Sequence, residues 1–277
     1  MQEGPPQPRD LHNFAAVDQT ADVSALVASL DLAHSLPFYQ DVNRQSYARL
    51  HVQPGHHLLD VGCGAGTDVQ ALARLVGPTG QVLGLDVSAA MIQEARRRAA
   101  SSGLPLAFRV GDVRQLDDAD AVFDGCRSAR VLCFQSEPAE VVAELARVVR
   151  VGGHLVAVEP ECESLVIDAP DLVLTRRFTA FWREGFAAGC VARHLPAVFA
   201  ACGLVDVAVT PHTVILRDAM LFFHRLFLFA DTVRKACEGG VATLQDGHHW
   251  QAALEAQGAR GQFFAACTFY MVSGRKA

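Results

Sequence analysis

The chain has 277 residues, of which 51% are hydrophobic and 19% are charged, enough apolar material for one α/β domain with additions. Its net charge of −6, with no run of Lys or Arg, argues against nucleic acid or an anionic membrane as the main partner. The longest apolar segment, residues 219–230, is too short to span a bilayer and contains His224 and Arg225. The first ten residues are polar and proline-rich, unlike a signal peptide.

The cysteines and histidines give no sign of a disulfide framework or a metal centre. The 8 cysteines include no Cys-x-x-Cys pair, and most lie in apolar segments, where a reduced cysteine behaves as a small hydrophobic residue. This predicts a reducing, cytoplasmic location. Two pairs of histidines are adjacent, at residues 56–57 and 248–249, but sequence neighbours point in different directions on a strand or helix. We therefore expect no metal.

Strands and helices alternate in the first part of the chain. Residues 18–50 have a helical pattern, interrupted at Leu36 and Pro37. Short apolar runs bounded by glycine or proline then predict five strands, at residues 57–61, 81–86, 105–110, 121–126 and 154–158. Apolar positions at helical spacing predict helices between them, at residues 67–76, after Ser88 and after Ser136. This alternation is typical of a mostly parallel sheet with helices on both faces.

The pattern becomes more helical after residue 160. Residues 170–202 predict two helices separated near Gly189, followed by a strand at 205–210. Two further helices, at 217–236 and 241–256, precede a final strand at 261–272. Together with the earlier elements, these strands predict a Rossmann-like α/β fold with a seven-stranded sheet.

The first strand ends in a glycine-rich turn, where residues 60–66 read DVGCGAG. Three glycines in such a turn allow a ligand to approach bare backbone. The spacing is not that of a dinucleotide-binding turn, because position 67 is Thr67, and the Gly-Lys-Ser/Thr ending of a phosphate-binding loop is absent. Asp60 would place a carboxylate beside the ligand, which suits a cationic amino group better than a pyrophosphate.

These residues resemble a known family. DVGCGAG, followed by GLDVSAAM and by Gly111 and Asp112, is similar to the sequence of class I S-adenosylmethionine-dependent methyltransferases. Within them, the segments RSARVL, LARVVRVGGHLVAVEP and RHLPAVFAACGL resemble the ubiquinone/menaquinone C-methyltransferase type and its natural-product relatives. The resemblance covers roughly residues 40–210. It implies an S-adenosylmethionine cofactor, S-adenosylhomocysteine as product, and a core at 51–212 between a helical cap (1–50) and a helical insertion with the final strand (213–277).

The resemblance also implies which residues bind the cofactor. Gly62, Gly64 and Gly66 would let backbone approach its methionine and ribose parts, and Asp86 can accept two hydrogen bonds from vicinal ribose hydroxyls. Arg127 and Ser128 fall where family members contact the cofactor mainly through backbone. Contacts with the adenine half are expected from Val87, Met91, Asp112 and Val113, although helical spacing suits a core role for Met91 equally well. Tyr39 and Arg44 are candidates for the cofactor's carboxylate, with packing or surface roles as the alternative.

The sequence says less about the molecule that accepts the methyl group. The Asn/Asp-Pro-Pro-aromatic sequence typical of enzymes that methylate nucleobase or glutamine amino groups is missing after the fourth strand, as is the histidine that many relatives have after Leu132. Candidate bases are therefore Glu159, which follows the fifth strand, and His34, His194 and His224. A solvated loop carboxylate is the alternative for Glu159, and a surface or core role for each histidine.

Residues 219–230, AMLFFHRLFLFA, are apolar around nearly the whole helix and so need cover on several sides. Burial against the sheet, or a homodimer contact, would provide it. The alternative is a roof over the acceptor pocket, joined by Phe178, Phe181 and Trp182, which predicts a lipophilic or aromatic small-molecule acceptor oriented by His224. A non-methylating cyclase or rearrangement enzyme, or a cofactor-binding protein without turnover, stays open on the same fold.

Overall fold

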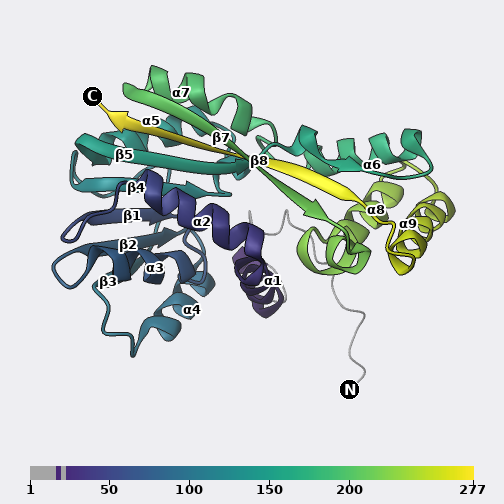
Figure 1. Cartoon of the computed structure of the whole chain (residues 1–277), viewed down its shortest axis with the longest axis horizontal. Helices are drawn as coiled ribbons and strands as arrows, with labels where there is room; N and C mark the ends of the chain where they lie inside the picture. The colour runs from purple at the N-terminus through teal and green to yellow at the C-terminus, as the bar shows by residue number, and fades with distance from the viewer. Residues whose placement is uncertain (1–16, 20–22) are drawn as a thin grey trace.

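An eight-stranded sheet forms the centre of the computed structural model, which describes residues 17–19 and 23–277 (Figure 1). The strands are β1 (His57–Val61), β2 (Gln81–Asp86), β3 (Leu106–Val110), β4 (Phe123–Ala129), β5 (Val149–Pro160), β6 (Val166–Ile167), β7 (Leu204–Leu216) and β8 (Ala265–Lys276). Strands β3, β2, β1, β4 and β5 lie side by side in that order and are parallel. β8 runs antiparallel between β7 on one side and β5 and β6 on the other. The predicted α/β sheet is confirmed, with the two-residue strand β6 as an unpredicted addition.

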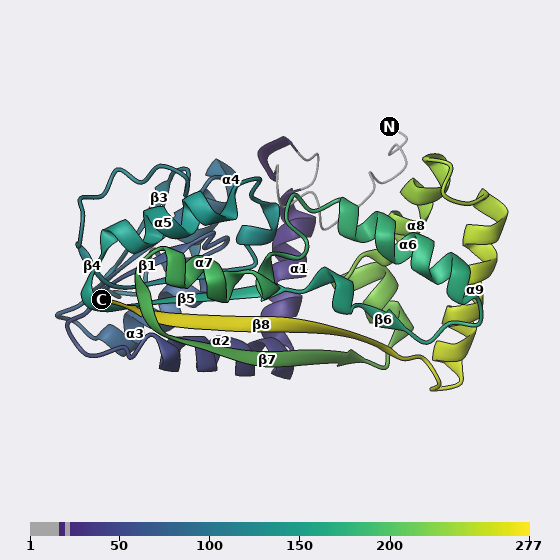
Figure 2. The same cartoon turned by 90° about the horizontal axis from the view of Figure 1, so that it is seen from above.

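Helices cover both faces of this sheet. They are α1 (Val23–Ser35), α2 (Pro37–Arg49), α3 (Thr67–Val76), α4 (Ala89–Ala99), α5 (Pro138–Val148), α6 (Leu172–Glu184), α7 (Leu195–Ala201), α8 (Phe229–Glu238) and α9 (Leu244–Ala259). Figure 2 shows α2 and α3 on one face and α5 and α7 on the other. None of the helices in the described part of the chain has both the length and the apolar character that crossing a membrane requires.

Two predicted helix boundaries follow directly from local chemistry. The break between α1 and α2 lies at Leu36, and Pro37 occupies the first turn of α2, where its missing N–H costs nothing. Ser88 caps α4 by accepting a hydrogen bond from the backbone N–H of Met91 at 3.1 Å. Asp18 accepts two more N–H groups of the same turn, from Ala89 and Ala90, and thereby ties residues 17–19 to the core.

A helical module of α6, α8 and α9 extends from one end of β7 and β8 (Figure 1). The long helix expected at 217–236 is wrong in detail, because a wide π-helical turn, η5 (Leu221–Leu226), ends at Leu226, and a left-handed Leu228 separates it from α8. This break allows four consecutive apolar residues, from Leu226 to Phe229, to be buried together, which a straight helix on one surface cannot do. The side chain of Trp250 on α9 donates to Thr175 Oγ1 of α6 at 2.9 Å and joins two helices of the module.

Candidate functional site

A cavity of about 470 Å³ opens at the carboxyl ends of the parallel strands. Residues at or just beyond the ends of five strands line it, namely Gly62, Asp86, Gly111, Ala129 and Pro160. This is the edge where open α/β sheets bind ligands. Residues of α1, α6, η5 and β8 contribute to the remaining walls. The volume falls within the range of about 300–1,000 Å³ that is usual for small-molecule sites.

The glycine turn after β1 forms one wall. Gly62 and Gly64 line the cavity with left-handed φ angles of +63° and +51°, which favour glycine strongly. A Cβ at position 62 would lie 2.2 Å from Cγ2 of Val131, so no side chain fits there. Gly66, expected at the ligand, instead packs against Phe108, 2.7 Å from where its Cβ would be. It provides close contact between the turn and the sheet.

Asp86 lies at the end of β2 on the same wall. Its carboxylate accepts the backbone N–H groups of Gly64 at 2.8 Å and Ser88 at 2.9 Å, which fixes its position beside the glycine turn. Burial raises the pKa of Asp86, and these two hydrogen bonds oppose that change by favouring the carboxylate. Val87 and Met91 line the cavity next to it.

The segment after β3 completes this part of the cavity. Asp112, Val113 and Arg114 all line it. The Asp112 carboxylate holds the Arg114 guanidinium at 2.6 Å, and this hydrogen bond lowers the pKa of Asp112. Together with Gly62, Gly64 and Asp86, these residues are called the glycine half below.

Asp60 does not face the cavity as the sequence suggested. It is 1% exposed, and its carboxylate accepts a hydrogen bond at 2.8 Å from Arg127, its partner across the β1–β4 ladder. The same guanidinium also donates to Asp68 at 3.1 Å, Asn43 at 2.8 Å and Ser46 at 2.8 Å. Because Arg127 neutralises Asp60 internally, the carboxylate is not available to a cationic ligand group. Arg127 itself reaches the cavity wall.

Of three further cofactor candidates, one lines the cavity and two do not. Tyr39 lines the cavity, and burial raises its pKa to about 12. Arg44 is instead exposed on α2, where it pairs with Asp41 one turn away, so it is not positioned to reach the cavity. Ser128 is fully buried within β4, behind the cavity wall that the described residues form.

Glu159 is neither at the cavity nor solvated, contrary to both interpretations of the sequence. Its buried carboxylate accepts the backbone N–H groups of three consecutive residues, Val131, Leu132 and Cys133, at 3.0, 2.9 and 3.2 Å. Burial raises the pKa of Glu159, and these N–H groups work against that change. The residue therefore holds the loop after β4 in place, a role that the sequence pattern did not suggest.

The histidines considered as candidate bases also differ in their position relative to the cavity. His224 is partly exposed and pairs with Glu255 at 3.1 Å, away from the cavity. His34 of α1 does line the cavity, but Nδ1 lies 2.8 Å from the carbonyl oxygen of Leu30 and Nε2 lies 3.3 Å from an oxygen of Asp68. With both ring nitrogens facing acceptors, neither is free to remove a proton from a ligand in this arrangement.

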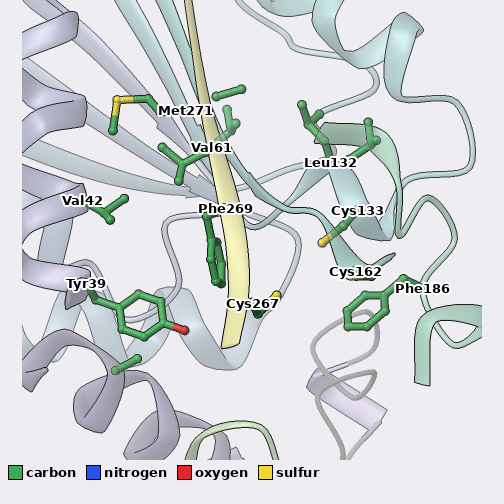
Figure 3. Close-up of a cluster of buried hydrophobic side chains, with 14 of the residues drawn as sticks. Tyr39, Val42, Val61, Leu132, Cys133, Cys162, Phe186, Cys267, Phe269 and Met271 are labelled. Carbon is green, nitrogen blue, oxygen red and sulfur yellow. The ribbon is translucent and has the colours of Figure 1, made fainter. Parts of the chain in front are cut away.

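Aromatic side chains form the opposite wall. Trp182, Phe186, Phe227 and Phe269 line the cavity, and these four residues are called the aromatic half below. Figure 3 shows Tyr39 and Phe186 on opposite sides of Phe269 and Cys267 of β8.

Three residues expected at this wall, Phe178, Phe181 and Phe223 of the apolar segment, do not line the cavity. Phe178 and Phe223 are fully buried in the core of the helical module, where each packs against Trp250 with ring centroids 5.0 and 5.9 Å away. The apolar segment 219–230 therefore divides its side chains, since Leu226 and Phe227 reach the cavity while Phe223 supports the module from within.

One group of potential metal ligands lies outside the cavity. Glu161, Glu163 and Cys190 bring their ligand atoms within 4.8 Å of one another. Arg193 already bridges both carboxylates, at 2.6 and 2.8 Å. The expected absence of a metal cofactor stays a prediction.

Comparison with known proteins agrees with this geometry. Residues 58–153 match the family model described as a methyltransferase domain. The chain is also 33% identical to the methyltransferase GfsG of Streptomyces halstedii over 60% of its own length and 57% of that protein. Residues 58–153 are therefore a methyltransferase domain.

Other relatives differ in how much of their sequence matches this chain. An uncharacterized protein of a Streptomyces fradiae transposon is 35% identical over 95% of this chain and 76% of its own length. A demethylmenaquinone methyltransferase of Symbiobacterium thermophilum is 32% identical, over 42% of this chain and 47% of that protein. The chain thus spans about half the length of the curated methyltransferases that it matches.

Solved structures show the same fold. YcgJ of Bacillus subtilis superposes with a TM-score of 0.60 at 18% identity, covering 86% of this chain and 98% of that one. The [4+2]-cyclase SpnF superposes with a TM-score of 0.53 at 22% identity, covering 86% and 80%. At these identities the similarity concerns architecture, because one fold supports different chemistries.

Proposed function

We propose that this chain binds S-adenosylmethionine and transfers its methyl group to a small lipophilic or aromatic metabolite. The observation that carries the proposal is the two-sided cavity. On one side, Gly62, Gly64 and Asp86 offer bare backbone and a carboxylate, and on the other side Trp182 and Phe227 offer apolar rings.

The glycine half fits the cofactor. Val131 fills the space beside Gly62 where a Cβ would lie, and both residues line the cavity, so a side chain at position 62 would displace this part of the wall. The Asp86 carboxylate accepts one hydrogen bond from Gly64 and one from Ser88. Its two oxygens have further lone pairs, which can accept hydrogen bonds from the vicinal hydroxyls of a ribose. Met91, Asp112 and Val113 line the same cavity as Asp86, which supports their assignment to the adenine.

The aromatic half suits an acceptor that is apolar. The cofactor, when bound, supplies a methyl group on a positively charged sulfur that an acceptor atom can attack. The contribution of this chain is to align the acceptor and to exclude water, which can supply most of the rate enhancement of such a displacement. The rings of Phe227 and Trp182 are buried, and their centroids lie 5.9 Å apart. They can therefore hold a flat or apolar molecule in one orientation.

We do not assign a general base. Glu159 is engaged by three backbone N–H groups and His224 by Glu255, so the proposal rests on alignment and leaves the O-, C- or N-acceptor open. A cytoplasmic location, a homodimer and the absence of nucleic acid as partner stay predictions from the sequence.

The proposal is tested by incubating the protein with S-adenosylmethionine and a panel of aromatic and lipophilic metabolites, and measuring S-adenosylhomocysteine. We expect release with at least one acceptor, and loss of that release when Asp86 is replaced by Ala. A protein that binds no S-adenosylmethionine would contradict the proposal.

A second candidate is a cyclase or rearrangement enzyme that binds the cofactor without consuming it. The likeness to the [4+2]-cyclase SpnF and the absence of a placed base among the described residues favour keeping it. The same incubation separates the two functions, since a cyclase changes its substrate without producing S-adenosylhomocysteine.

A further inference from the structure

Arg130 is a cationic side chain of the cavity wall that has no ion-pair partner among the described residues. Three other basic residues of the wall have acidic partners, because Arg114 pairs with Asp112, and both Arg127 and His34 lie against Asp68. Across residues 17–19 and 23–277, no carboxylate lies within ion-pair distance of Arg130. A half-buried guanidinium in a ligand cavity without a counter-charge is a site for an anionic ligand group.

The backbone holds Arg130 firmly at this place. It follows β4 directly, with a left-handed φ of +60°, and its N–H donates to the carbonyl oxygen of Val158 at 2.8 Å. The next three N–H groups donate to Glu159. Left-handed non-glycine residues cost free energy and persist only where the surroundings fix them. The loop is therefore a rigid support for the side chain.

An aromatic surface orients the guanidinium. Its central carbon lies 5.2 Å from the centroid of the Tyr39 ring, which in turn packs against Phe269 at 5.9 Å. A cation over the face of a ring is attracted electrostatically, and the planar fork keeps its N–H groups available at its edge. Neither aromatic residue can neutralise the charge, so the donors stay available to a ligand.

We propose that Arg130 binds a carboxylate inside this cavity, an inference that rests on the proposed function. Two sources share this chemistry, the methionine tail of the cofactor and an acidic group on the acceptor. The loop lies between the two halves, since Val131 packs against Gly62 and Phe134 packs against Phe186 with ring centroids 5.4 Å apart. Arg130 thus takes the carboxylate-binding role that the sequence suggested for Arg44, which is exposed and paired with Asp41.

The first arm of the test compares two cofactor analogues by calorimetry. S-adenosylhomocysteine carries the amino-acid tail, whereas methylthioadenosine lacks it. If the tail is the ligand, Arg130→Met weakens S-adenosylhomocysteine by about ten- to a hundredfold and leaves methylthioadenosine within about threefold. Arg130→Lys should give an intermediate loss, because an ammonium keeps the charge without the two-pronged geometry.

The second arm uses protein saturated with S-adenosylhomocysteine and the probe pair 2-naphthoate and 2-naphthamide. If the acceptor supplies the carboxylate, wild-type protein prefers naphthoate by about tenfold or more, and Arg130→Met removes the preference while cofactor affinity is unchanged. Arg114→Met is the control from the same cavity, and it should alter both adenosine ligands equally. Thermal unfolding verifies that each variant is native.

The proposal is wrong if native Arg130→Met binds S-adenosylhomocysteine as wild type does and no Arg130-dependent preference for naphthoate exists. Wild-type protein that binds neither adenosine ligand would contradict the proposed function instead, so the two failures are distinguishable.

Discussion

The two halves of the cavity are built in opposite ways. The glycine half takes its shape from backbone, because Gly62 and Gly64 occupy left-handed conformations and Asp86 accepts the N–H groups of Gly64 and Ser88. The aromatic half takes its shape from side chains that come from distant segments, such as Trp182 on α6 and Phe269 on β8. A cavity with this division can keep one half constant while changes of single side chains alter the other.

This difference has an energetic consequence. Side chains of the aromatic half belong to the same buried cluster that stabilises the helical module, so binding and stability are coupled there. In the glycine half, the groups facing the cavity contribute little buried apolar area. Substitutions in this half should therefore affect ligand affinity more than the free energy of unfolding. The substitutions below test that separation.

The largest expected effect on stability is in the module behind the aromatic half. Phe223→Ala should lower the free energy of unfolding by about 3–5 kcal/mol, because Phe223 is 1% exposed and a large cavity would remain. The affinity of native protein for S-adenosylhomocysteine should stay within about threefold of wild type. Denaturant unfolding and calorimetry measure the two quantities. A large loss of affinity would show that the two halves are not separable.

The largest expected effect on affinity is at Gly62. Gly62→Ala should weaken S-adenosylhomocysteine by at least about a hundredfold, because the new Cβ would meet Val131 and displace the turn. The matched control is Gly77→Ala, at a φ of +66° with no atom within 4 Å of the new Cβ. Like Gly62 it has a positive φ, but its new Cβ meets no other atom, and its affinity should match that of wild type. Equal losses in both variants would attribute the effect to strain alone.

A smaller effect should depend on pH and concerns Asp68, behind the glycine turn. Burial opposes the charge of Asp68, but the charge of Arg127 and hydrogen bonds from His34 and Tyr47 outweigh it and hold the pKa well below the usual 3.8. Because the folded pKa is depressed, the stabilisation is full above the ordinary value and is lost as pH falls through the folded pKa. Asp68→Asn should therefore cost about 1–3 kcal/mol at pH 7.

The stability difference between the two proteins should be constant above about pH 4 and narrow progressively below it, because Asp68 of the unfolded chain takes up a proton there while the folded carboxylate stays ionised. Unfolding free energies of both proteins between pH 3 and 7 measure this difference. A gap that does not change with pH would mean that packing, and not ionisation, makes Asp68 stabilising.

The glycine half could be predicted from sequence because its determinants are local. The turn at 60–66, the aspartate ending β2 and the Ser88 cap are each encoded within a few residues, and the structure places Gly62, Gly64 and Asp86 together at the cavity. The pairing of Asp60 with Arg127 could not be predicted in this way, since it depends on the register between β1 and β4. Arg130 lies in a segment that resembled the family, but its left-handed backbone has no sequence signal.

The limits of the strands show the same dependence on non-local structure. The strand expected at 121–126 runs from Phe123 to Ala129, because Ala121 is left-handed in the turn before it. The final strand begins at Ala265 and not at 261, since Gly261 turns the chain after α9 with a φ of +69°. For the apolar segment 219–230, composition indicated burial correctly, but which rings reach the cavity is decided by the break at Leu228.

The central claim is that the cavity recognises the adenosine part of S-adenosylmethionine through Asp86. Calorimetric titration of wild-type protein and of Asp86→Ala with S-adenosylmethionine, and of wild-type protein with NAD, tests it most directly. We expect wild-type protein to bind S-adenosylmethionine in preference to NAD, and Asp86→Ala to bind it about 1.5–3 kcal/mol more weakly, the scale of a lost hydrogen bond to a charged group. Wild-type protein that binds NAD without measurable affinity for S-adenosylmethionine, or an Asp86→Ala variant with wild-type affinity, would contradict the account.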